Sequence, residues 1–159
     1  MKVFIPQSVS EEGINLLKEH GCEIVTGNGW TEEELIEGIK DCDAALVRTA
    51  SYSKKVIEAA PKLKIIARHG VGFDNVDINA AAERGVWVTN TPRALSESVA
   101  EFTLSLLLMS GKNILQCSNA MRNGDYKYKN DIRVLIFLEK HWEFLALAGL
   151  AELLQKKLI

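Results

Sequence analysis

Two glycines and several polar side chains stand together in the run Ala67–Asp77, which reads ARHGVGFDNVD. Gly70 and Gly72 permit tight backbone turns and let amide N–H groups approach an anion closely. Because the run follows an apolar segment of strand type, we expect it at the carboxyl end of a strand, where open α/β sheets bind ligands. The run predicts either an anion-binding turn or an ordinary strand-to-helix turn.

Arg48 follows a second apolar run, Ala44–Val47. Its guanidinium could clamp a carboxylate or phosphate at the same sheet edge as Gly70, although a surface arginine would look the same in the sequence. His69 is expected to be structural, because no acid or nucleophile has a defined spacing to it. The glycine pair is not a dinucleotide fingerprint, since Asn75 stands where a third glycine would be needed. No metal-ligand spacing is present, so no metal site is expected.

The composition excludes several classes of protein. The chain has 159 residues, with 19 Lys and Arg against 21 Asp and Glu, and a formal net charge of −2. This balance argues against a nucleic-acid or membrane-surface protein, and no apolar run approaches the ~18–20 residues that span a bilayer. The three cysteines are scattered and form no CxxC pair, which favours a reducing, cytoplasmic setting.

Strand and helix patterns alternate over the first 90 or so residues. Strands are expected at Val3–Pro6, Glu23–Thr26, Ala44–Val47, Leu63–Ala67 and Val86–Thr89, and helices at Ser8–His20, Thr31–Lys40, Lys54–Ala60 and Asn79–Arg84. Ser8 with Glu11, and Thr31 with Glu34, have the spacing of capping boxes. The alternation predicts an α/β fold with a five-stranded, parallel, flavodoxin-like sheet flanked by helices.

A longer helix is expected to follow, with Ser98 and Glu101 as its capping box and an apolar stripe that runs towards Met121. Such a stripe needs a partner, which suggests a second lobe or a homodimer contact through the helix that starts at Ser98. From Val134 the composition becomes more apolar, and a helical tail is expected. The predicted boundaries are 1–95 for the lobe, 96–133 for the connecting helix and loop, and 134–159 for the tail.

Four motifs in the right order carry a resemblance to a known family: Arg68–Asp77, Asn79–Gly85, Val88–Pro92 and Ser98–Glu101. Over residues 1–133 the chain resembles the D-isomer-specific 2-hydroxyacid dehydrogenases, and among them the phosphoglycerate dehydrogenases. The resemblance implies a substrate-binding lobe whose partner lobe binds NAD, and reversible hydride transfer between NAD and a small 2-hydroxy acid, 3-phosphoglycerate being one candidate.

The same resemblance assigns roles to single residues. Gly70, Val71 and Gly72 would present backbone amides to the substrate carboxylate, Val71 would also border the nicotinamide of the cofactor, and Arg48 would lie in the substrate loop. Leu95 departs from the asparagine that is frequent in relatives. The family's catalytic Arg, Glu and His and its pyrophosphate-binding turn belong to the second lobe. No catalytic residue is therefore expected within these 159 residues, and NAD should bind weakly or not at all.

Residues 134–159 can also be interpreted as the product of a shifted nucleotide reading frame. Shifting the frame by one nucleotide permits the strand-turn-helix sequence GILGFGRIGRIV, with its turn glycines at Ala146, Ala148 and Ala151, although the choice of first bases is partly free. The hypothesis is that residues 134–159 are a frameshifted tail on a truncated dehydrogenase, and the alternative is a natural helical extension.

Two further functions stay open. One is a non-catalytic module that dimerises with full-length subunits through the helix from Ser98. The other is a phospho-receiver domain, against which Gln7 and Ser8 argue, since they stand where an acidic pair is required.

Overall fold

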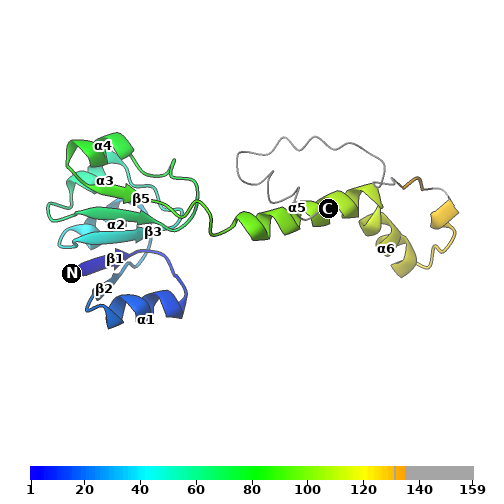
Figure 1. Ribbon diagram of the computed structural model, residues 1–159, viewed down its shortest axis with the longest axis horizontal. Helices are drawn as coiled ribbons and strands as arrows, with labels where there is room; N and C mark the ends of the chain where they lie inside the picture. The colour runs from blue at the N-terminus through cyan, green and yellow to red at the C-terminus, as the bar shows by residue number, and fades with distance from the viewer. Residues whose placement is uncertain (131, 135–159) are drawn as a thin grey trace. The chain divides into compact units, whose positions relative to one another are not determined.

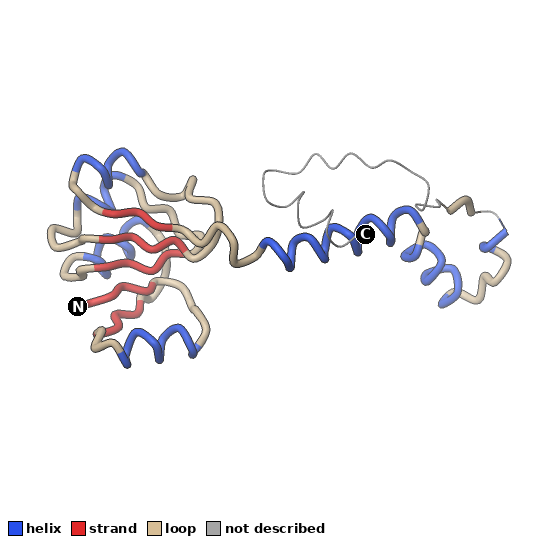
Figure 2. The backbone as a smooth tube through the Cα atoms, viewed as in Figure 1, coloured by secondary structure: helices blue, strands red, loops and turns tan. Residues whose placement is uncertain are grey.

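Five short apolar strands form the centre of the first of two compact units, Met1–Ala94. The computed structural model describes residues 1–130 and 132–134. The strands are β1 (Lys2–Ile5), β2 (Glu23–Thr26), β3 (Ala44–Val47), β4 (Ile65–Arg68) and β5 (Trp87–Thr89). All pairings are parallel, in the order β2-β1-β3-β4-β5, and Figure 2 shows the strands side by side. The α/β fold with a five-stranded parallel sheet is thus confirmed.

Helices cover both faces of this sheet, as a parallel sheet requires (Figure 1). They are α1 (Glu11–Glu19), α2 (Glu32–Ile39), α3 (Lys54–Glu58) and α4 (Ile78–Glu83). α1 packs Ile14 and Leu17 against the smaller core cluster on one face. α2, α3 and α4 enclose the larger cluster on the other face, whose fully buried members include Phe4, Val47 and Ile66.

The helix starts agree with the sequence in one case and not in another. At α2 the predicted capping box is confirmed, since the Thr31 N–H donates to the Glu34 carboxylate at 3.0 Å and the Glu34 N–H donates to the Thr31 hydroxyl. The hydrogen bonds that the Thr31 N–H and hydroxyl donate to the Glu34 carboxylate lower its pKa. The box at Ser8 is wrong, because α1 begins at Glu11 and Ser10 is its N-cap. Ser8 lies in the loop from β1, where its carbonyl oxygen accepts a hydrogen bond from Arg48.

The second unit begins at Leu95. It contains α5 (Ser96–Gly111), α6 (Ile114–Arg122) and a short 3-10 turn, Tyr128–Asn130. The predicted capping box of Ser98 and Glu101 is wrong, because α5 starts at Ser96 and places both residues inside the helix. The apolar pattern also does not form one continuous helix to Met121, because Asn113 adopts a left-handed conformation (φ 53°) and separates α5 from α6.

The expectations for 134–159 fall, apart from Val134, outside the described residues. Among the helices that the structure does describe, none combines the length and the apolar character needed to cross a membrane.

Two helical glycines give a matched test of the packing. A Cβ added at Gly38 in α2 would lie 2.3 Å from the Phe4 ring, whereas at Gly13 in α1 it would meet only the Ser10 hydroxyl at 3.7 Å. Gly38→Ala is expected to lower the free energy of unfolding by about 1–3 kcal/mol through overpacking. Gly13→Ala should raise it by up to about 1 kcal/mol, because alanine restricts the unfolded chain. Urea unfolding of both variants measures the difference, and equal effects would contradict the described packing around Phe4.

Candidate functional site

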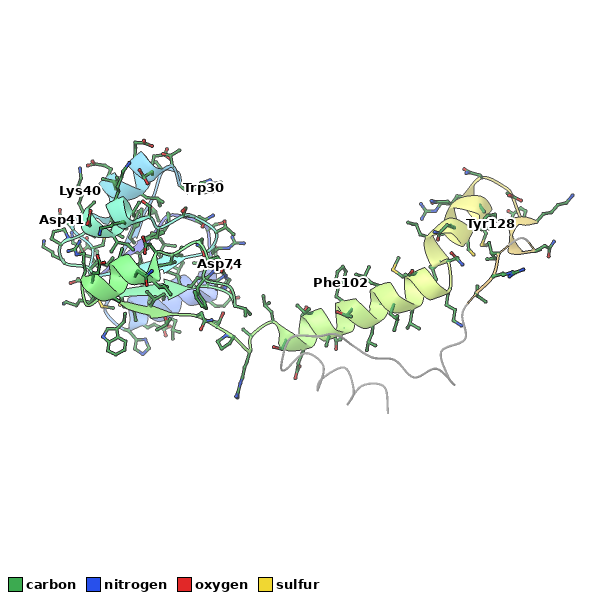
Figure 3. All side chains as sticks on the ribbon, turned by 90° about the horizontal axis from the view of Figure 1, so that it is seen from above. Trp30, Lys40, Asp41, Asp74, Phe102 and Tyr128 are labelled. Atoms are coloured by element: carbon green, nitrogen blue, oxygen red, sulfur yellow. The ribbon has the colours of Figure 1, made fainter. Side chains whose placement is uncertain are left out.

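The loops that follow the strands meet at one end of the first unit, because parallel strands all end at the same edge of the sheet. Figure 3 shows Asp74 at this end, opposite to Lys40 and Asp41. β1 and β3 are neighbours although β2 lies between them in the sequence. From β1 the chain continues to β2 on one side of this pair, and from β3 it continues to β4 and β5 on the other side. The place where the strand order reverses in this way is a switch point, and open α/β sheets bind ligands there.

The side chain of Gln7 fills this switch point. Gln7 is 8% exposed and is the buried polar residue in the described part of the chain. Its Oε1 accepts hydrogen bonds from the N–H groups of Thr49 at 2.8 Å and Ala50 at 2.9 Å, and its Nε2 donates to the Thr49 hydroxyl at 2.8 Å. The loop after β1 is thus fixed to the loop after β3. Sequence reasoning missed this role, because it depends on partners more than 40 residues away.

Arg48 lies in the fixed loop, where it was expected. Its side chain is exposed, and its Nη1 donates to the Ser8 carbonyl oxygen at 2.9 Å. The turn that follows β4, residues 69–76, is called the Gly70 turn below. The structure places Arg48 at the same sheet edge as this turn, with its guanidinium bonded to the loop from β1. On the far side, Asn75 Nδ2 donates to the Ala50 carbonyl at 2.7 Å and joins the Arg48 loop to the Gly70 turn.

The Gly70 turn presents two free N–H groups. Gly70 has φ +144°, a conformation that favours glycine. The turn is held from β5, because the Thr91 N–H donates to the Gly70 carbonyl at 2.9 Å and Asn90 Nδ2 donates to the Val71 carbonyl at 2.8 Å. The N–H groups of Val71 and Gly72 have no acceptor among the described residues, and both residues are exposed. Adjacent unpaired amides of this kind bind anions.

A second cation lies against this turn and was not assigned a role from the sequence. The guanidinium of Arg68 occupies the space beside Gly70, where an added Cβ would lie 1.5 Å from Nη1. Arg68 Nη1 donates to the His69 carbonyl, and its buried Nε has no hydrogen-bond partner in the described part of the chain. Its position two residues before Gly70 in the sequence was the available signal. The charge of Arg68 adds to the attraction for an anion at the turn.

The side chains of this region are less suited to proton transfer or metal binding than to anion binding. Tyr52 anchors the Gly70 turn, since its N–H donates to the Asn75 carbonyl at 2.7 Å. Burial raises the pKa of the Tyr52 phenol, so this group stays neutral at ordinary pH. His69 is exposed, and the described residues contain no cluster of His, Cys, Asp or Glu suited to a metal ion. The arrangement is therefore suited to binding an anion through N–H groups and guanidinium charge.

Several known proteins are similar to this chain in sequence and fold. D-3-phosphoglycerate dehydrogenase of Methanocaldococcus jannaschii is 42% identical over 130 residues, which cover 81% of this chain and 25% of the relative. The NAD+-bound crystal structure of 3-phosphoglycerate dehydrogenase of Entamoeba histolytica matches with a TM-score of 0.63 and 31% identity, over 70% of this chain and 39% of that one. An NADPH-dependent glyoxylate/hydroxypyruvate reductase of Sinorhizobium meliloti matches with a TM-score of 0.80 and 25% identity, over 99% of this chain and 49% of that one.

The chain thus spans between a quarter and a half of the length of these relatives. A family profile described as "D-isomer specific 2-hydroxyacid dehydrogenase, catalytic domain" matches residues 3–152. From this match and the identity to its relatives, the chain belongs to the D-isomer-specific 2-hydroxyacid dehydrogenase family and carries its catalytic domain.

Proposed function

We propose that this domain binds the carboxylate of a small 2-hydroxy or 2-oxo acid, as the substrate-binding lobe of an NAD-dependent dehydrogenase. The observation that carries the proposal is the pair of N–H groups at Val71 and Gly72, which have no acceptor among the described residues. The Arg68 guanidinium lies beside Gly70, and Arg48 follows the neighbouring strand at the same sheet edge. The names of the relatives supply the substrate class, since phosphoglycerate, glyoxylate and hydroxypyruvate all carry a carboxylate. Arg48 is the side chain we assign to the charge of the substrate.

The residues of this turn do not fit a dinucleotide. A pyrophosphate turn needs a third glycine, but Asn75 stands at that position and its amide is bonded to Ala50. In the dehydrogenase as a whole, bound NAD would take up the hydride, with Val71 bordering its nicotinamide. We expect the 159-residue chain by itself to bind NAD weakly or not at all and to show no dehydrogenase activity.

A non-catalytic role as a pairing module is the second candidate. α5 exposes large apolar side chains, among them Phe102 at 63% and Leu106 at 49% (Figure 3 shows Phe102). We propose that this helix pairs with a second subunit, either another copy or a full-length dehydrogenase. Formation of mixed dimers with a full-length relative would favour this role.

We also propose that residues 134–159 come from a shifted reading frame. The support is the shifted sequence GILGFGRIGRIV, which would supply a pyrophosphate turn within this segment. Sequencing of the gene through codon 133 tests this proposal. A downstream frame that encodes the turn is expected, and the lack of any such frame would show that the tail is a natural extension.

Anion binding can be followed at single amides. Titration of the ¹⁵N-labelled chain with glyoxylate should shift the amide resonances of Val71 and Gly72, whereas neutral glycolaldehyde, which lacks the carboxylate, should leave them in place. Arg48→Gln is expected to weaken glyoxylate binding about tenfold, the size of one lost charge-assisted hydrogen bond. Arg122→Gln, which removes an exposed arginine of α6, is the matched control and should have no effect.

Two outcomes of this titration would contradict the proposed function. One is a pair of amides that respond equally to glycolaldehyde and glyoxylate. The other is an Arg48→Gln variant that binds glyoxylate as the parent chain does. Addition of NAD to the same sample is expected to shift neither amide.

The hydrogen bonds of the Gln7 side chain should contribute to the free energy of unfolding. Gln7→Ala leaves the N–H groups of Thr49 and Ala50 without their acceptor and should lower the free energy of unfolding by about 2 kcal/mol. Gln7→Glu keeps an acceptor oxygen in the same place and should retain most of that stability. Urea unfolding compares the variants, and an alanine variant as stable as the parent would show that these hydrogen bonds are dispensable.

A further inference from the structure

The strand β5 lies at one edge of the sheet that the structure describes. Among the described strands it pairs only with β4, with Val88 opposite Ile66. The Trp87 N–H donates to the Lys64 carbonyl at 2.9 Å, so the backbone groups of Trp87 point into the sheet. Because these directions alternate along a strand, the N–H and C=O of Val88 point outward from the edge.

An apolar groove of about 560 Å³ runs beside this edge, between β5 and α4. Its lining includes Phe73, Ile78, Ala82 and Val88, and none of the lining residues is ionisable. On the opposite face of the strand, the Trp87 side chain is 75% exposed. The edge thus offers backbone hydrogen-bonding groups and apolar contacts on both faces.

The other edge of the same sheet, β2, is protected differently. β2 carries Glu23, which pairs with Lys2 at 3.3 Å. Charged side chains on an edge strand oppose the addition of another strand, and proteins commonly use them for this purpose. β5 reads Trp-Val-Thr and has no such charge. The two edges therefore differ in whether they can accept a further strand.

We propose that β5 pairs antiparallel with β5 of a second copy of this chain, about a two-fold axis at Val88. In this arrangement each Val88 N–H donates to the Val88 carbonyl of the other copy, and each Trp87 lies across from Thr89. One residue supplies both the donor and the acceptor, so the edge is complementary to itself, as a two-fold interface requires. No like charges meet at the axis despite the net charge of −2, because neither β5 nor the groove carries an ionisable side chain. Aromatic and β-branched residues facing each other across strands stabilise such a pair.

Hydrogen exchange at two amides tests the proposal on the unmodified chain. The Val88 amide should exchange quickly in dilute solution and become protected at least tenfold as the concentration of the chain rises. Ile24 is the matched control at the other edge. The Glu23 N–H donates to the Met1 carbonyl at 3.0 Å, and because directions alternate along a strand, the Ile24 N–H points outward. Ile24 should stay unprotected at every concentration. A Val88 amide that remains unprotected while the chain associates would overturn the proposal.

A proline variant tests the same contact by mass. Val88→Pro removes an N–H group that faces away from β4, a position where an edge strand tolerates proline. Its self-association, measured by light scattering after gel filtration, should weaken at least tenfold, whereas Ile24→Pro should leave association unchanged. Phe102→Glu alters the exposed face of α5 and should leave the protection of Val88 intact, which separates this contact from pairing through α5 and from substrate binding. Should Val88→Pro fail to fold, the exchange measurement on the parent chain decides.

Discussion

The buried carboxamide of Gln7 is the contact on which the geometry of the site depends. At a switch point in a parallel sheet, the loops after two neighbouring strands diverge, and their N–H groups lack partners within the sheet. Gln7 satisfies two of them, at Thr49 and Ala50, and also bonds the Thr49 hydroxyl. Asn75 does the corresponding work from the side of β4, at the Ala50 carbonyl. The loop that carries Arg48 is thus held by amide side chains from both directions.

The Gly70 turn is fixed through its carbonyl groups, so two of its N–H groups can stay without an acceptor in the described part of the chain. In most proteins, nearly all buried backbone N–H groups donate hydrogen bonds to other groups of the chain or to water. Here the carbonyl groups of Gly70 and Val71 are bonded by Thr91 and Asn90, which fixes the turn through its acceptors and leaves the donors of Val71 and Gly72 exposed. Under the proposed function, an anion bound here would cost the chain little entropy, because the donors are already held in place.

The sheet could be predicted from the sequence because its signals are local. Apolar runs such as Ala44–Val47 coincide with the observed strands, and the box of Thr31 and Glu34 was read correctly. The box at Ser8 failed because Ser10, two residues later, caps α1. The box at Ser98 failed because α5 already starts at Ser96, with Leu95 as an N-cap that makes no side-chain hydrogen bond. The roles of Gln7 and Asn75 could not be predicted at all, because they depend on contacts with residues distant in the sequence. The turn at Gly70 follows the end of β4, as the preceding apolar run predicts, whereas its role in ligand binding stays a prediction.

The positions of the edge and the site within one sheet bear on how they could act together. The unpaired amides of Val71 and Gly72 follow the end of β4, whereas the free edge of β5 lies along the side of the sheet. Antiparallel pairing of two β5 strands would direct the carboxyl ends of the two sheets in opposite directions. The two Gly70 turns, with the proposed anion sites, would then lie at opposite ends of the joined sheet, each open to substrate. Self-association at this edge would therefore be compatible with substrate binding, and the two properties could be selected independently.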